Sequence, residues 1–161
     1  MEEAVVSAIT DDTSEAKITV GGVPDRPGVA ARLFRELANR GINVDMIVQN
    51  TGANGMTDIS FTVAKTDLEV SRDTCNQIKG DIGAADVTTD DNIGRVSIVG
   101  AGMKSSPGVT ALMFETLYKH GINIEMISTS SIRISCVLRA EKVADAVRYL
   151  HTAFGLDVIE F

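Results

Sequence analysis

A long internal repeat is the feature that most limits how this chain can fold. GGVPDRPGVAARLF (residues 21–34) returns as GAGMKSSPGVTALMF (residues 100–114), with Pro27 and Pro107 standing 80 positions apart. Their alignment also matches Ile18, Gly22, Gly28, Val29, Ala31, Phe34, Leu37, Gly41, Ile42, Asn43, Met46 and Ile47 with identical residues. Stacked repeats are shorter, at roughly 20–50 residues. Each copy is therefore expected to be a whole small domain.

Each copy has the same order of predicted elements. KITVGGV predicts a strand, and a one-faced helix follows from the spacing of Ala30, Leu33, Phe34, Leu37 and Ala38. Pro27 and Pro107 suit the first turn of this helix, and Gly41 and Gly121 suit its left-handed end. A hairpin and a second helix come next in each copy. Alternation predicts the second strand of the hairpin, at Ile59, Phe61 and Val63 in the first copy and at Ile132, Ile134, Cys136 and Leu138 in the second. One-faced spacing predicts the second helix, with Leu68, Ser71, Cys75, Ile78 and Ile82 in the first copy and Val143, Val147, Leu150 and Phe154 in the second.

The predicted fold class is α+β, with two ferredoxin-like β-α-β-β-α-β domains built on antiparallel sheets. A short run around Val87 completes the first domain. EAVVSAIT, near the N-terminus, belongs to neither copy and needs a sheet to pair with, so it is predicted to complete the second domain. The expected boundaries are 15–90 for the inserted first domain and 3–10 plus 92–161 for the second.

Composition argues against nucleic acid and membranes as partners. With 15 Lys and Arg against 22 Asp and Glu, the formal charge is −7, and aromatic residues make up only 4% of the chain. Such a chain lacks a phosphate-neutralising surface and base-stacking side chains. No apolar run approaches the roughly 20 residues of a membrane span. The N-terminus does not resemble a signal peptide, so a cytoplasmic location is expected.

The sequence contains no complete motif for catalysis, metal binding or cofactor binding. A dinucleotide fingerprint would need glycine at Ser105, and a P-loop would need lysine at Val109. Cys75 and Cys136 are far apart in sequence and are predicted to be buried, reduced thiols. No metal, no cofactor and no self-sufficient enzyme activity are expected.

The repeated joint between strand and helix is the best candidate for binding. A helix start presents free N–H groups that suit an anion, and Gly28 and Gly108 allow close approach to the backbone. Asn43 and Asn123 recur in the Gly-Ile-Asn motif and offer amide groups for the carboxylate and ammonium of an amino acid. Simple turn chemistry is the alternative interpretation of both motifs.

Several stretches together resemble one known family. They are SEAKITVGGVPDRPGVAARLF, INVDMIVQN, TDISFTV, RVSIVGAGMKSSPGVTALMFETL, INIEMISTSSIRISCVL and AVRYLHTAFGL. They are similar to the tandem ACT domains of the aspartate kinase regulatory (β) subunit, over essentially the whole chain. The resemblance implies a regulator that binds threonine, possibly jointly with lysine, and transmits feedback inhibition to an aspartate kinase catalytic subunit. Because the exposed edges of such small sheets favour side-by-side pairing, a homodimer is expected.

The resemblance also implies which residues bind the effector, at an interface between ACT domains of different subunits. They are Asp25, Pro27, Gly28, Val29, Ala30, Asn43 and Gln49, with Asn123 and Ile124 from the facing domain. The second joint departs from this set, because Ser105, Thr110 and Thr129 stand in place of Asp25, Ala30 and Gln49. Two alternatives stay open: a free-standing tandem-ACT metabolite sensor that regulates another enzyme or transcription, and a small enzyme of ferredoxin-like fold.

Overall fold

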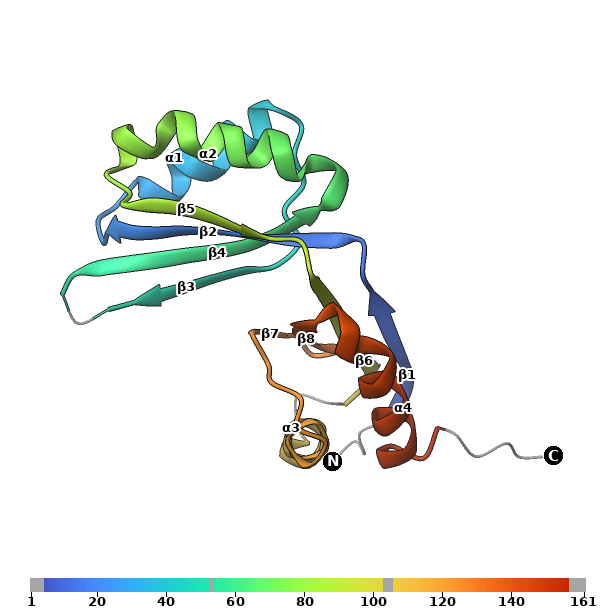
Figure 1. Ribbon diagram of the computed structural model, residues 1–161. Coiled ribbons are helices and arrows are strands. Elements are labelled where there is room, and N and C mark those ends of the chain that lie inside the picture. Colours follow the sequence, from blue (N-terminus) through green and yellow to red (C-terminus); the bar gives the residue numbers. More distant parts are fainter. Residues whose placement is uncertain (1–4, 53, 103–105, 157–161) are drawn as a thin grey trace. The chain divides into compact units, whose positions relative to one another are not determined.

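The computed structural model describes residues 5–52, 54–102 and 106–156, and the chain divides into two compact units (Figure 1). Ser14–Asp91 forms one, here called the inserted unit. Met1–Thr13 and Asn92–Phe161 together form the other, here called the terminal unit. Each unit has its own sheet and its own hydrophobic core.

The inserted unit is a four-stranded antiparallel sheet with two helices on one face (Figure 1). Its elements are β2 (Glu15–Pro24), α1 (Val29–Asn39), β3 (Ile47–Thr51), β4 (Met56–Ala64), α2 (Leu68–Ile82) and β5 (Asp86–Asp90). The strand order is β3-β4-β2-β5. The predicted last strand is confirmed, since Val87 of β5 pairs with Val20 of β2.

The terminal unit repeats this plan with a strand taken from the start of the chain. Its elements are β1 (Val5–Asp12), β6 (Ile93–Ala101), α3 (Pro107–Lys119), β7 (Met126–Thr129), β8 (Arg133–Arg139) and α4 (Val143–Ala153). The strand order is β1-β6-β8-β7, and β1 runs antiparallel to β6 with Asp12 opposite Arg95. The predicted role of the N-terminal strand is therefore confirmed.

Both cores include residues that the periodicity or the repeat singled out. In the inserted unit, Ile18, Phe61 and Cys75 are fully buried, and the Phe34 ring meets Phe61 edge-on with centroids 5.5 Å apart. In the terminal unit, Ile98 and Cys136 are likewise fully buried. Burial raises the pKa of the Cys75 thiol to about 11 and that of Cys136 to about 12. Both thiols thus stay protonated at neutral pH.

Three expectations about burial were wrong in detail. Ala30 and Ala38 are exposed, because the buried face of α1 is centred on Val29, Leu33 and Leu37 and is narrower than the predicted stripe. Ile132 is 59% exposed because β8 begins only at Arg133, after the turn.

The two proline-glycine joints begin their helices differently. Pro107 opens the first turn of α3, as predicted. Pro27 lies outside α1, which begins at Val29 with Gly28 as a left-handed N-cap at φ 92°. The expectation that Pro27 stands in the first turn was therefore wrong, because glycine at this joint adopts a conformation that ends the preceding extended chain.

Gly41 and Gly121 end their helices as predicted, each in the left-handed region at φ 72° and φ 68°. The N–H of Ile42 donates to the carbonyl of Leu37 at 3.1 Å, and that of Gly41 to Ala38 at 2.9 Å. This is the Schellman arrangement, in which the residue after the glycine also packs against the helix. Gly121 and Ile122 repeat it at the end of α3.

The described residues contain no helix long and apolar enough to cross a membrane.

Candidate functional site

The joint between β2 and α1 forms one wall of a cavity. Gly28 holds the chain in a left-handed turn, and its carbonyl accepts the first helical hydrogen bond from Arg32 at 2.9 Å. The N–H of Asp25 donates to the carbonyl of Gly55 at 2.9 Å, which fixes the joint to the hairpin between β3 and β4. No acidic side chain stands in the first turn of α1 itself, and the positive end of the helix faces the joint.

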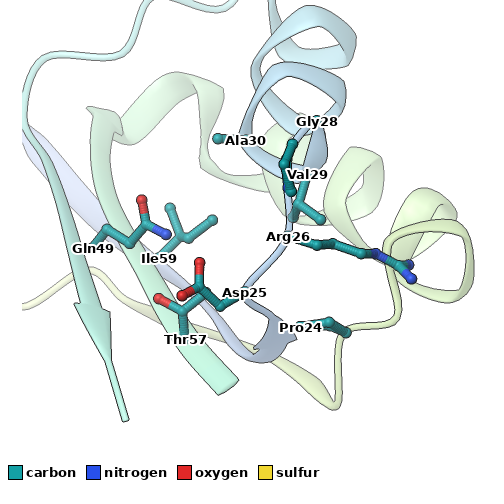
Figure 2. Close-up of a pocket in the computed structure, with 10 residues that line it drawn as sticks. Pro24, Asp25, Arg26, Gly28, Val29, Ala30, Gln49, Thr57 and Ile59 are labelled. Carbon is teal, nitrogen blue, oxygen red and sulfur yellow. The ribbon is translucent and has the colours of Figure 1, made fainter. Parts of the chain in front are cut away.

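The cavity has a volume of about 320 Å³ and draws its walls from three segments (Figure 2). It is lined by Pro24, Asp25, Arg26, Pro27, Gly28, Val29, Ala30, Gln49, Thr57 and Ile59. This volume is at the small end of the range for ligand pockets, roughly 300–1,000 Å³. It suits a metabolite with few heavy atoms.

The pairing of β3 with β4 brings the polar lining residues of the cavity close together. Gln49 of β3 pairs with Ile59 of β4, and Thr57 lies two residues from Ile59 on the same face. In Figure 2, the side chains of Asp25, Gln49 and Thr57 lie around one space, whereas that of Arg26 extends away from Gln49. A carboxylate, an amide and a hydroxyl therefore surround the space beside the start of α1.

These groups are suited to binding an amino acid. The Asp25 carboxylate can accept hydrogen bonds from an ammonium group, and N–H groups at a helix start can donate to a carboxylate. Thr57 is only 2% exposed, and its hydroxyl donates to the carbonyl of Asn50 at 3.1 Å. Its oxygen lone pairs can still accept from a ligand.

The described residues offer no metal centre, since none of them form a group of three His, Cys, Asp or Glu side chains able to hold an ion. The two cysteines are buried and hold their protons, which makes them poor nucleophiles.

The structure brings six predicted residues together at this cavity and leaves three elsewhere. Asp25, Pro27, Gly28, Val29, Ala30 and Gln49 line it. Asn43 is exposed and is not among the lining residues. Asn123 and Ile124 belong to the terminal unit, where Asn123 is exposed and Ile124 packs against that unit's core.

The repeated Gly-Ile-Asn motif largely serves to end the helix that precedes it. The glycine supplies the left-handed turn, and Ile42 and Ile122 are buried in their cores. The structural interpretation therefore accounts for the first two residues of the motif.

Sequence reasoning missed four residues of the lining: Pro24, Arg26, Thr57 and Ile59. Ile59 was predicted only as core. The alternation of β4 places Thr57 on the same face as Ile59, so the hairpin register was the signal that would have found it.

At the second joint, Ser105 lies outside the described residues. Thr110 is partly buried in α3, and Thr129 is exposed at the end of β7.

Comparison with known proteins places both units in one family. The sequence model of the ACT domain matches residues 18–77 and 96–154, once in each unit. The chain belongs to the ACT-domain family. Among curated relatives, the aspartokinase of Mycolicibacterium smegmatis is 47% identical over 97% of this chain, and the aspartate kinase of Pseudomonas putida is 46% identical over 98%.

Solved structures agree with this assignment. A chain of the aspartokinase alpha and beta subunits is 44% identical, with a TM-score of 0.89, over 94% of this chain and 99% of that one. The ligand-free regulatory subunit of aspartate kinase from Thermus thermophilus is 40% identical, with a TM-score of 0.88, over 93% and 99%. Together the comparisons identify the two ACT units as an aspartate kinase regulatory region.

This chain spans only part of its curated relatives. It covers 38% of both the M. smegmatis and the P. putida proteins, whereas it covers nearly all of the regulatory-subunit chains.

Proposed function

We propose that this chain is a non-catalytic regulator that binds threonine in the cavity at the β2–α1 joint and thereby inhibits an aspartate kinase catalytic subunit. The observation that carries the proposal is the grouping of Asp25, Gln49 and Thr57 around one small cavity beside the start of α1. The similarity to regulatory subunits supports the partner.

Each group of threonine has a counterpart in this cavity. The ammonium faces the carboxylate of Asp25, the carboxylate faces the backbone around Gly28, and the side-chain hydroxyl lies within reach of Gln49 and Thr57. Val29 and Ile59 supply apolar contacts for the methyl group. Lysine, as a joint effector, stays part of the proposal.

A small effector acts by favouring one arrangement of the regulator over another. Its influence equals the difference between its affinities for the two arrangements, typically about 1–3 kcal/mol. The Asp25 N–H bond to Gly55 offers a direct route, since a ligand held by Asp25 also biases the β3–β4 hairpin. In the proposed homodimer, Asn43 contributes to effector binding, together with Asn123 and Ile124 of a partner subunit.

Calorimetric titration with threonine tests the proposal. We expect saturable binding to the wild-type chain and a loss of about tenfold or more in an Asp25→Asn, Gln49→Ala double variant, because a charge-assisted and an amide hydrogen bond are removed. Thr129→Ala, the equivalent position of the second repeat, is the matched control and is expected to bind as the wild type does. Threonine binding that survives the double variant would contradict the assigned site.

The inhibitory role needs the catalytic subunit. With both proteins present, threonine is expected to lower the rate of aspartate phosphorylation, and the double variant to abolish this effect. A wild-type complex that binds threonine with no change in rate would contradict the regulatory assignment and leave the binding site intact.

A further inference from the structure

The inserted unit contains a second cavity, of about 410 Å³, that shares no lining residue with the first. It is lined by Gly22, Asn50, Gly52, Asn54, Met56, Asp58 and Ala85. The ligand-binding role proposed above does not involve it.

The two cavities lie on opposite faces of the same end of the sheet. Gln49 pairs with Ile59, and the next residues along, Asn50 and Asp58, pair with each other. Successive residues of a strand point to opposite faces. Because Ile59 belongs to the core beneath the helices, Asp58 and Asn50 stand on the face that the helices leave uncovered.

Two glycines of β2 lie at or beside this second cavity, and Gly22 lines it. The β2–β4 register shifts between Val20 and Val23, and Gly22 lies in that irregularity with φ 61°. A Cβ on Gly22 would approach the Ala85 side chain to 2.7 Å. A Cβ on Gly21 would come within 2.2 Å of a carboxylate oxygen of Asp86 and 3.5 Å of one of Asp58. The bare backbone of Gly21 therefore lets the Asp86 and Asp58 carboxylates lie close to β2, although only Asp58 lines the cavity.

The polar groups at this cavity favour a cation. Asp58 accepts a hydrogen bond from the Gly22 N–H at 2.9 Å, which fixes one carboxylate oxygen in place. Asn50 and Asn54 bring side-chain amide oxygens, and no Lys or Arg is among the described lining residues. An anion would meet the carboxylate of Asp58 with no compensating charge, whereas an ammonium group would find several acceptors.

We propose that this cavity is a second ligand site, which takes a small organic molecule through a terminal primary ammonium group, with no carboxylate beside it, held by Asp58. Asn50 assists from the paired position on β3. The site goes beyond the proposed function, because it uses different residues and the opposite face of the sheet.

The two sites are linked through β3 and β4. Thr57 lines the first cavity, and its hydroxyl donates to the carbonyl of Asn50, which lines the second. A ligand at Asp58 therefore touches the strand pair that carries Gln49 and Thr57.

Nuclear magnetic resonance titration of the full chain locates the site directly. Lysine is the probe because it carries a terminal ammonium at the end of a four-carbon chain, and norleucine has that chain and the same α-amino and α-carboxyl groups without the terminal ammonium. With lysine, we expect the amide signals of Gly22, Gly52 and Asp58 to shift. Norleucine is expected to shift them about tenfold more weakly at equal concentration.

Two variants separate this site from the first. Asp58→Asn keeps an oxygen that can accept from Gly22 but removes the charge, so lysine affinity is expected to fall about tenfold without loss of signal dispersion. Gln49→Ala is expected to leave lysine binding at the second site unchanged. If Asp58→Asn disturbs folding, Asn50→Ala is the second variant, and it is also expected to lower the affinity for lysine.

Three outcomes would overturn the proposal. They are shifts of equal size with norleucine, lysine-induced shifts confined to Asp25, Gly28 and Gln49, and the absence of any lysine-induced shift at Gly22 and Asp58. None of these outcomes bears on threonine binding, which is measured separately on the Asp25 and Gln49 variants.

Discussion

At the scale of single residues, the two copies of Pro-Gly-Val show how one motif adopts two conformations. Gly28 is the left-handed N-cap of α1, while Gly108 lies within the first turn of α3 and has no positive φ. A Cβ would meet nothing within 4 Å at either glycine. Any difference between the two alanine variants must therefore come from the backbone rather than from a clash.

The two alanine substitutions are predicted to have opposite effects on stability. Gly28→Ala forces a β-carbon into the left-handed region and should destabilise the inserted unit by about 1 kcal/mol. Gly108→Ala removes glycine from a helix and should stabilise the terminal unit by about 0.5 kcal/mol. Scanning calorimetry checks both, since about 1 kcal/mol shifts Tm by roughly 4–8 °C in a unit of this size. Equal shifts of the same sign would contradict the two backbone assignments.

At the scale of elements, each buried cysteine belongs to an element that packs into a core: Cys75 to α2 and Cys136 to β8. Because burial raises the pKa of both thiols above 9.0, we expect neither to react with a thiol reagent at about pH 8 until the protein unfolds. A disulfide reagent that releases a coloured thiolate measures this rate in native and denaturing buffer. Rapid reaction of either thiol in the native protein would contradict the assigned burial.

The same pKa values predict how stability depends on pH. A thiol whose folded pKa is raised favours the folded state fully below pH 9.0, and this contribution is lost as the pH rises toward 11 to 12. The midpoint of urea unfolding is therefore expected to fall above pH 9. A Cys75→Ala, Cys136→Ala double variant is the control, and its midpoint should fall less over that range.

The elements themselves could be predicted because their patterns are local. Alternation at Ile59, Phe61 and Val63 identified β4, and the glycine at position 41 identified the end of α1. The start of α1 could not be placed from Pro27, since glycine allows either helical or left-handed backbone at the next position. Thr57 was missed at the cavity for a different reason. Its place there depends on the pairing of β3 with β4, which is not local.

At the scale of the whole molecule, the repeat and the orphan strand together predicted an inserted unit, and sheet pairing shows how the insertion is accommodated. Asp12 of β1 stands opposite Arg95 of β6, so the chain leaves and re-enters the terminal unit at one end of one strand pair. Ser14–Asp91 carries its own four strands and its own core between these points. The terminal unit, by contrast, is built from β1, before the inserted unit, and from the elements that follow it.

Fragments are predicted to fold according to this division. Residues 14–91 alone should unfold cooperatively, because no strand of their sheet lies outside the fragment. Residues 92–161 alone should not, since the loss of β1 leaves β6 as a bare edge and removes Val6 and Ile9 from the core. Joining residues 1–13 directly to residue 92 should restore folding. Asp12 and Arg95 are paired, and in the fusion only four residues would connect them: Thr13, Asn92, Ile93 and Gly94. A link of this length is typical of a β-hairpin.

Circular dichroism during urea unfolding compares the three fragments. The sharpest comparison is between residues 92–161 and the fusion, which differ only by the segment containing β1. Cooperative unfolding of residues 92–161 without that segment would show that β1 is dispensable. Failure of residues 14–91 to fold would show that the inserted unit depends on its host, and both of its cavities would then require the intact chain.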